Sequence, residues 1–120
     1  MARNFKNIKA WQFSDDLTVE IYSVTKTFPK EELYGITSQL RRAAVSVPTN
    51  IAEGANREHQ KEYFHFLNIA FGSVAEVEYL LHLANRLGYL QNSVYKKMEE
   101  LQTTVAKTLY GLIVAVKKDA

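Results

Sequence analysis

The sequence predicts an all-α protein, an antiparallel up-down four-helix bundle formed by a single domain over residues 1–120. Apolar residues recur at intervals of three and four along the chain, which is the spacing of one helix face, and no sustained stretch alternates apolar and polar residues as a strand does. Prolines and glycines divide this pattern into four segments. Long helical segments joined by short connections favour an up-down bundle.

The composition indicates a globular protein without disulfides or a membrane span. A chain of 120 residues with 47% hydrophobic and 23% charged residues can bury one core and is unlike a disordered chain. It has no cysteine, which excludes disulfides and thiolate metal sites and favours the reducing cytoplasm. We find neither a signal peptide nor the roughly 20 apolar residues of a membrane span. The net charge of +2 is too small to indicate an anionic partner by itself.

The first two helices are bounded by proline and glycine. The first is predicted over residues 8–28, where an apolar stripe repeats until Pro29 ends it. The second is predicted over residues 30–53, with an apolar stripe that begins at Leu33. Gly54 is expected to be its C-terminal stop.

The other two helices carry more apolar surface than one core needs. The third is predicted over residues 60–87, before Gly88, and the fourth over residues 92–117. The third has two apolar faces, and the second and fourth also turn apolar residues outward. Such area usually marks a protein interface, so we expect self-association, the alternative being a wide buried stripe with scattered exposed residues. The candidate interface residues are Tyr34, Val45, Leu80, Leu83 and Ile113.

Four stretches of the chain carry a resemblance to a known family. They are AWQ in the first helix, FPKEELYGITSQLRRAAVSVPTNIAEG through the second, EYFHFLNIAFGSVAEVE in the third, and LGYL after it. Together they closely resemble the four-helix-bundle proteins encoded within intervening sequences of bacterial 23S rRNA genes. The accessory variability proteins of diversity-generating retroelements are related bundles.

The resemblance implies an antiparallel bundle that assembles as a ring-like homopentamer and holds nucleic acid on a basic surface. It implies no established catalytic activity, so we expect no enzyme, no cofactor and no small-molecule substrate. The family-motif residues with expected structural roles are Trp11, Gly35, Pro48, Asn50, Glu53, Gly54 and Gly72. One departure lies at the third helix, where His59 stands in place of the Ser or Thr of a capping box with Glu62.

Arg41 and Arg42 are adjacent, so on a helix they diverge by about 100° and serve different contacts. Arg41 is expected on the side of Tyr34 and Val45, where it could pair with a carboxylate of a neighbouring subunit. Arg42 is expected on a polar stripe. A guanidinium also fits phosphate, so both an ion-pair role and a phosphate role stay open for each arginine.

Pro48 lies within the second helix and removes the amide donor that would pair with the carbonyl of Ala44. We expect a kink there, with Asn50 satisfying the freed backbone groups. A shaped pocket is the functional alternative. Gly72 is predicted to mark a close contact between helices rather than a ligand cradle.

An enzymatic reading rests on Glu62 and His65, which have the i, i+3 spacing of carboxylate-bridged di-iron bundles. Such a site needs two further glutamates that point into the core and a second Glu-x-x-His motif, and the chain has no second motif. Glu62 and His65 are also expected to face outward. Glu78 and His82, four residues apart, supply too few ligands. The sequence therefore predicts no metal site.

A helix-turn-helix reading would place its turn at Gly35, with Thr37 as the cap and Gln39, Arg41 and Arg42 on the recognition helix. The first helix is too long for this motif. The apolar rhythm also runs through Gly35, which favours one continuous helix instead.

These patterns together predict a cytoplasmic, non-enzymatic bundle that self-associates and acts as a nucleic-acid-binding or scaffolding module. The resemblance favours RNA as the nucleic acid. The candidate binding residues are Arg41, Arg42, Arg57 and Lys61. A scaffold that binds only proteins is the alternative.

Overall fold

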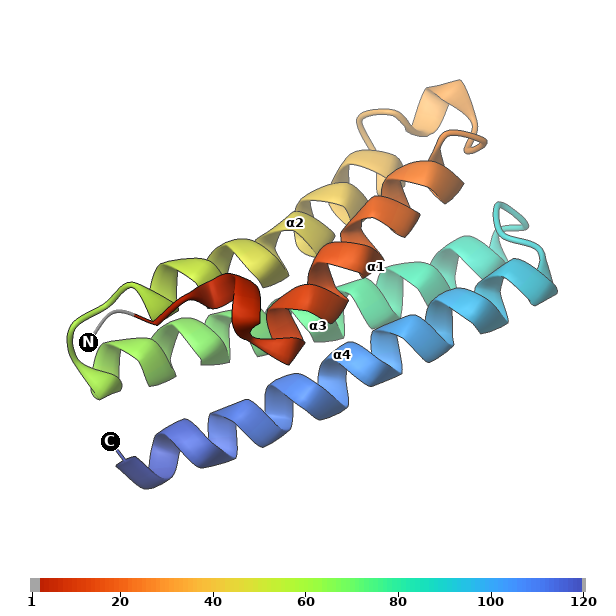
Figure 1. The fold of residues 1–120 in the computed structure, drawn as a ribbon. Helices are drawn as coiled ribbons and strands as arrows, with labels where there is room; N and C mark the ends of the chain where they lie inside the picture. Colours follow the sequence, from red (N-terminus) through yellow and green to blue (C-terminus); the bar gives the residue numbers. More distant parts are fainter. Residues whose placement is uncertain (1–2, 120) are drawn as a thin grey trace.

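The computed structural model describes residues 3–119, and these residues form four long helices (Figure 1). The helices are α1 (Lys9–Thr25), α2 (Ile36–Ala55), α3 (Gln60–Arg86) and α4 (Asn92–Asp119), with short 3-10 helices η1 (Phe5–Asn7) and η2 (Lys30–Glu32). Each long helix packs against the next, α4 returns to α1, and neighbours run antiparallel (Figure 1). The predicted all-α four-helix bundle is confirmed. None of the helices in the described part combines the length and apolarity needed to span a membrane.

The core consists of aliphatic side chains from all four helices. The largest fully buried side chains are Leu17, Ile21, Leu40, Val47, Ile51, Leu67, Val74, Val77, Leu81, Met98, Val105 and Leu109. Burial of each such side chain contributes about 1.5–3 kcal/mol, so this stripe on each helix holds the bundle together. Polar groups available for binding therefore lie mainly on the outer faces and at the ends of the bundle.

The start of α1 is braced by η1, because Phe5 packs edge-on against Trp11 with ring centroids 5.0 Å apart. Trp11 thus packs η1 against the first turn of α1. The helix ends at Thr25, earlier than the predicted residue 28. The chain tightens there, since Lys26 N–H donates to Ser23 O at 3.3 Å. The apolar stripe overestimated this helix because Phe28 is buried from a turn rather than from a helix.

The second helix begins at Ile36, not at residue 30 as predicted. Gly35 precedes it as the N-cap, with φ −110° and ψ −121°, and a Cβ there would collide with the Glu32 carboxylate. The apolar rhythm was misleading, because Leu33 belongs to this connection and is 47% exposed. The expectation of one continuous helix through Gly35 was wrong. The segment before Gly35 is only a 3-10 turn, so the residues still do not form a helix-turn-helix.

The second helix also continues through Gly54, which the sequence predicted as its stop, and ends at Ala55. Gly54 is buried, and a Cβ on it would lie 2.7 Å from Cβ of Phe66 and 3.1 Å from Cδ1 of Tyr63. Its role is therefore close packing of α2 against α3. Gly72 is not closely packed, because no atom of residues 3–119 lies within 4 Å of a Cβ built there. The expectation that Gly72 marks a close contact between helices was therefore wrong.

Pro48 lies inside α2, and the carbonyl that it leaves free is satisfied from α1. The Thr18 hydroxyl lies 3.1 Å from Ala44 O and 2.8 Å from Ser14 O, within donating distance of both. Asn50 does not reach Ala44. Its Nδ2 donates instead to Ser46 O at 2.8 Å, so the expectation that Asn50 repairs the proline site was wrong.

The third and fourth helices agree with the predicted bounds to within two residues. The third ends at Arg86 and is followed by Gly88, whose φ of +79° is in the left-handed region. The Gly88 N–H donates to Asn85 O and the Tyr89 N–H donates to Ala84 O, which is a Schellman cap. His59 is the N-cap of α3 and makes no side-chain capping bond, as the imperfect capping box suggested.

Candidate functional site

The two adjacent arginines of α2 line different grooves, as their divergence on the helix predicted. Arg41 turns toward α1, where its Nε donates to Thr25 Oγ1 at 2.8 Å and its guanidinium lies 4.8 Å from the Tyr22 ring centre. It does not share a groove with Tyr34, so its expected placement beside that residue was wrong. Tyr34 instead lines the groove of Arg42.

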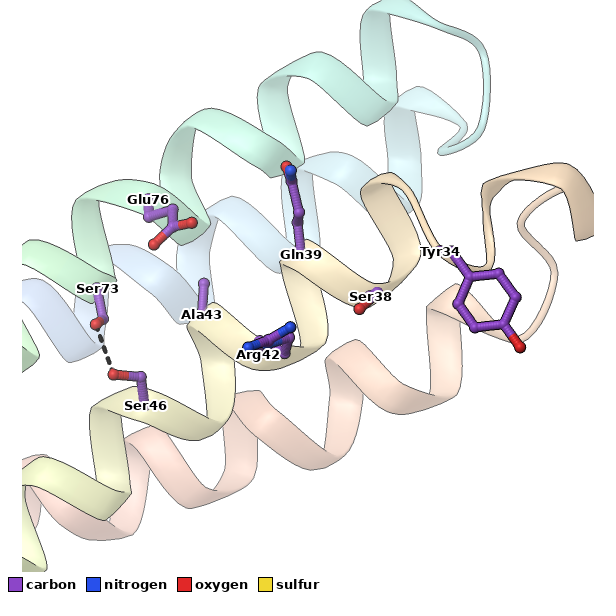
Figure 2. Close-up of a pocket in the computed structure, with 8 residues that line it drawn as sticks. All are labelled: Tyr34, Ser38, Gln39, Arg42, Ala43, Ser46, Ser73 and Glu76. Atoms are coloured by element: carbon purple, nitrogen blue, oxygen red, sulfur yellow. Dashed lines mark hydrogen bonds between the residues drawn. The ribbon is translucent and has the colours of Figure 1, made fainter.

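The groove of Arg42 lies between α2 and α3 and has a volume of about 520 Å³ (Figure 2). Polar side chains dominate its lining, with Arg42 as the cation and Glu76 of α3 as the acid. Ser46 and Ser73 join the two helices across it, with their hydroxyl oxygens 2.8 Å apart. Tyr34 stands at one end and points away from the bundle (Figure 2), 93% exposed.

A second groove of about 440 Å³ continues along α2 and shares Arg42 and Ser46 with the first. Arg42 therefore lies where the two grooves meet. We call the polar α2 residues that line these two grooves the α2 face; it consists of Ser38, Gln39, Arg42, Ser46, Thr49 and Asn50. The second groove reaches Glu53, at the far end of the helix.

Arg57 lies in the turn between α2 and α3, Lys61 lies in the first turn of α3, and both are exposed. Arg57 forms the ion pair that the structure records within residues 3–119, to Glu53 with N and O 3.8 Å apart, and its guanidinium lies 4.8 Å from the Phe66 ring centre. Arg42 is about 20 Å from the end of α2 at Ala55, at 1.5 Å of rise per residue, and Arg57 lies beyond that end. The candidate cations thus form an extended surface that the α2 face connects, rather than one cluster.

The sequence did not anticipate how Arg3 supports this turn. Its Nη1 donates to Ala55 O at 3.2 Å and to Arg57 O at 3.0 Å, and its Nη2 donates to the Gln60 side chain. The guanidinium also lies 4.3 Å from the ring centre of Tyr63. A cation at the carboxyl end of α2 is favoured by the helix dipole. No local pattern could reveal these contacts, because they join positions more than 50 residues apart.

The interface candidates separate into three groups. Tyr34 and Val45 are exposed, and Leu83 is half-buried against the core. Leu80 and Ile113 are only 5% and 7% exposed, so the expectation that they face outward was wrong. Each lies close enough to its main apolar stripe to be covered by the neighbouring helix within one chain.

An exposed apolar patch that the sequence analysis missed lies on α3 and α4. It consists of Phe71, Tyr110 and Val114, which we call the α3–α4 patch. The Phe71 and Tyr110 ring centroids are 6.1 Å apart, and Val114 follows Tyr110 by one helical turn. The spacing of Phe71 along α3 fits the buried stripe of that helix, yet Phe71 is 37% exposed.

The carboxylate and imidazole pairs of α3 face the solvent. Glu62, His65, Glu78 and His82 are all exposed. Within residues 3–119, no three or more His, Cys, Asp and Glu side chains come together as a metal site would require. The chemistry that the α2 face offers is hydrogen bonding by hydroxyl, amide and guanidinium groups, with the exposed phenol of Tyr34 at one end.

Comparison with known proteins identifies a matching family and a solved structure with the same fold. A family model described as 23S rRNA-intervening sequence protein matches residues 6–111. A crystal structure of a protein of unknown function from the S23 ribosomal protein family of Bacteroides thetaiotaomicron VPI-5482 superposes with a TM-score of 0.81. The two sequences are 25% identical, and the match covers 87% of this chain and 97% of that one. No curated protein matches the chain.

Proposed function

Because this chain belongs to the 23S rRNA-intervening sequence protein family, we propose that it is a non-enzymatic, homo-oligomeric RNA-binding protein of the cytoplasm whose RNA surface is the α2 face. The observation that carries this proposal is the position of Arg42. It is exposed where two grooves meet, with neutral hydrogen-bonding groups on both sides. Its guanidinium takes part in no ion pair recorded within residues 3–119.

The chemistry of the α2 face suits a nucleic-acid backbone. A guanidinium offers a fork of N–H donors that matches phosphate, and hydroxyl and amide groups commonly contact phosphates and sugars. The hydroxyls of Ser38, Ser46 and Thr49 could also pair with the 2′-hydroxyl that distinguishes RNA. Tyr34 is exposed at the end of the groove, where stacking on a base would contribute about 1–3 kcal/mol.

Two acids limit the affinity of a single subunit. Glu76 lines the first groove and Glu53 lines the second, so phosphate is favoured near Arg42 and Arg57 and disfavoured beside these carboxylates. Repetition of the surface in an oligomer would compensate, because simultaneous engagement of several weak sites raises the overall affinity without any new contact. RNA binding and self-association are therefore parts of one proposal.

Fluorescence anisotropy with a labelled single-stranded RNA tests the RNA surface. Arg42→Glu should weaken binding and lower the slope of log affinity against log salt by about 0.7 for each phosphate that the variant no longer binds. Arg57→Glu together with Lys61→Glu should weaken binding further. Lys97→Glu on α4 is the matched control, because it changes the net charge equally on another exposed surface.

An unchanged affinity and salt slope for Arg42→Glu, with intact helical content and mass, would refute the α2 face as the RNA surface. The protein-scaffold alternative would be favoured if the native protein shows no affinity for RNA in moderate salt. Weaker binding by Lys97→Glu alone would move the surface to α4.

We further propose that the α3–α4 patch contributes to the contact between subunits, in a homopentamer as the resemblance implies. Two exposed aromatic rings side by side with a valine are an unusual use of outer surface in a monomer. Light scattering at micromolar concentration should give several times the mass of one chain. Tyr110→Asp should shift the population toward smaller species, because a charge is costly to bury in an apolar contact.

Thr104→Asp is the control for this substitution, since Thr104 is exposed on the same helix and lies about 120° around it from Tyr110. It should leave the mass unchanged. A monomer at all concentrations would contradict self-association, and an unchanged mass for Tyr110→Asp would exclude the patch from the contact.

A further inference from the structure

A third groove lies at the end of the bundle, between the carboxyl end of α1, η2 and the first turn of α2. Its volume is about 450 Å³, within the range of small-molecule sites. It is distinct from the α2 face: the residues lining it belong to neither of the Arg42 grooves. The RNA proposal makes no use of it.

Thr37 is the unusual residue of this third groove. It is 3% exposed, and its hydroxyl has no hydrogen-bond partner within the described chain. Thr25, in the same groove and 2% exposed, is the natural comparison, because its hydroxyl lies 2.7 Å from Ile21 O and accepts from Arg41 Nε. Buried polar groups are nearly always paired, so an unpaired hydroxyl beside a groove points to a missing partner.

The charge of the groove shows what kind of partner would fit. Lys26, Lys30 and Arg41 line it, and no acid does. None of the three cations takes part in an ion pair recorded within residues 3–119. The Arg41 guanidinium is held in place by Thr25 and by the Tyr22 ring, while its terminal nitrogens make no recorded hydrogen bond there. The amino end of α2 adds partial positive charge at Thr37.

The remaining lining is apolar. Phe28 is buried at 6% exposed, Leu33 is 47% exposed, and Pro29 lies between them in the chain. A bare inorganic anion would leave this apolar surface in contact with water, whereas an anion with a hydrocarbon body would remove it from water. We propose that the third groove binds a small organic carboxylate, with its head at Thr37 and Arg41 and its apolar body against Phe28 and Leu33.

Isothermal titration calorimetry with octanoate tests the site on the purified full chain. A ligand of this size that uses both parts of the groove should bind with a Kd of about 0.1 to 1 mM. Octanol lacks the charge and inorganic phosphate lacks the apolar body, so each should bind at least about tenfold more weakly. Equal binding of octanol, or of phosphate, would overturn the proposal.

Substitution of Thr37 gives two effects of opposite sign. Thr37→Val removes an unpaired hydroxyl, so without ligand it should raise the Tm by about 4 °C. The same change should weaken octanoate binding about tenfold, because the carboxylate loses a donor. A Kd unchanged by Thr37→Val would contradict the assignment of the head to this residue.

Two further variants guard against a purely structural effect. Lys26→Gln with Lys30→Gln alters exposed residues and should weaken octanoate binding several-fold without changing the Tm. The matched pair on α4, Lys96→Gln with Lys97→Gln, should leave both octanoate binding and the Tm unchanged. If both pairs weakened octanoate equally, the attraction would belong to the net charge and the site would be refuted. Octanoate binding that appears only when an oligomer dissociates would show that a second copy fills the groove, which also contradicts the proposal.

Discussion

Pro48 leaves the carbonyl oxygen of Ala44 without its helical donor, and the Thr18 hydroxyl of α1 approaches it at 3.1 Å. A buried carbonyl without a donor costs about 1–3 kcal/mol, so this contact permits a proline in the middle of a packed helix. The sequence showed the carbonyl that Pro48 frees but not the residue that satisfies it. The donor lies 26 positions away, and its place follows from the packing of α1 on α2.

A double-mutant cycle checks this interaction. Thr18→Val should destabilise the native protein by about 1 kcal/mol more than it destabilises Pro48→Ala, in which the restored amide pairs with Ala44 O. Urea unfolding of the four proteins measures the coupling. The Thr18 hydroxyl has one proton and a second acceptor in Ser14 O at 2.8 Å, so the coupling measures how much more Thr18 contributes when Ala44 O lacks its helical donor. A coupling of zero would mean that Thr18 does not serve the proline site.

Tyr63 links stability to pH at the alkaline end. Burial raises the pKa of its phenol above the usual 10.0, and the nearby Arg3 guanidinium opposes this rise. Above pH 10 the unfolded chain loses this proton more readily than the folded chain, so the free energy of unfolding should fall as the pH rises. The contribution of Tyr63 is fully present below pH 10.

Urea unfolding at pH 8 and at pH 10.5 measures this effect. Tyr63→Phe should lose less stability between the two pH values than the native protein does. Tyr89 and Tyr95 also have raised pKa values, Tyr89 mainly through its hydrogen bond to Glu32, and both remain in each protein compared. An equal fall in the two proteins would show that Tyr63 does not carry the dependence.

At the scale of elements, two glycines that both lie within long helices differ in how closely they are packed. Gly54 lets α2 approach α3, because a Cβ there would lie 2.7 Å from Cβ of Phe66. Gly72, in the middle of α3, has open space around it. The sequence placed both glycines in structural roles but exchanged the reasons, since Gly54 was taken for a stop and Gly72 for a close contact.

Alanine substitution distinguishes these two roles. Gly54→Ala should destabilise the fold by about 1–3 kcal/mol through overpacking, despite the better helix propensity of alanine. Gly72→Ala should stabilise it by about 0.5–1 kcal/mol, since only the propensity changes. Thermal unfolding of both variants beside the native protein measures the difference. Changes of the same sign would contradict the packing described here.

Helix number, order and approximate bounds could be predicted because the apolar period of a long amphipathic helix is a strong signal. The errors arose where the exposure of an apolar residue is decided by a connection or by a neighbouring helix rather than by the apolar stripe of its own helix. Leu33 continued the stripe but lies in a connection, and Phe28 is buried from a turn. Leu80 and Ile113 lay off the main stripes, yet neighbouring helices cover them.

At the scale of the whole molecule, the candidate site is a surface rather than a cavity with reactive groups. The sequence predicted that Arg41 and Arg42 diverge, but it could not show that Arg41 is engaged by α1 while Arg42 faces a groove shared with α3. That distinction depends on how three helices pack. Repetition of the α2 face in an oligomer would turn one weakly charged subunit into an extended RNA surface.

Ultraviolet cross-linking of the purified protein to single-stranded RNA, followed by mass spectrometry of tryptic peptides, tests the proposed RNA surface most directly. Tyr34 lies in the peptide of residues 31–41, and a base stacked on its exposed ring should cross-link there. We expect this peptide to carry the cross-link in the native protein and to lose it in Tyr34→Ala. Cross-links confined to the α4 peptides around Lys96 and Lys97 would contradict an RNA surface on the α2 face.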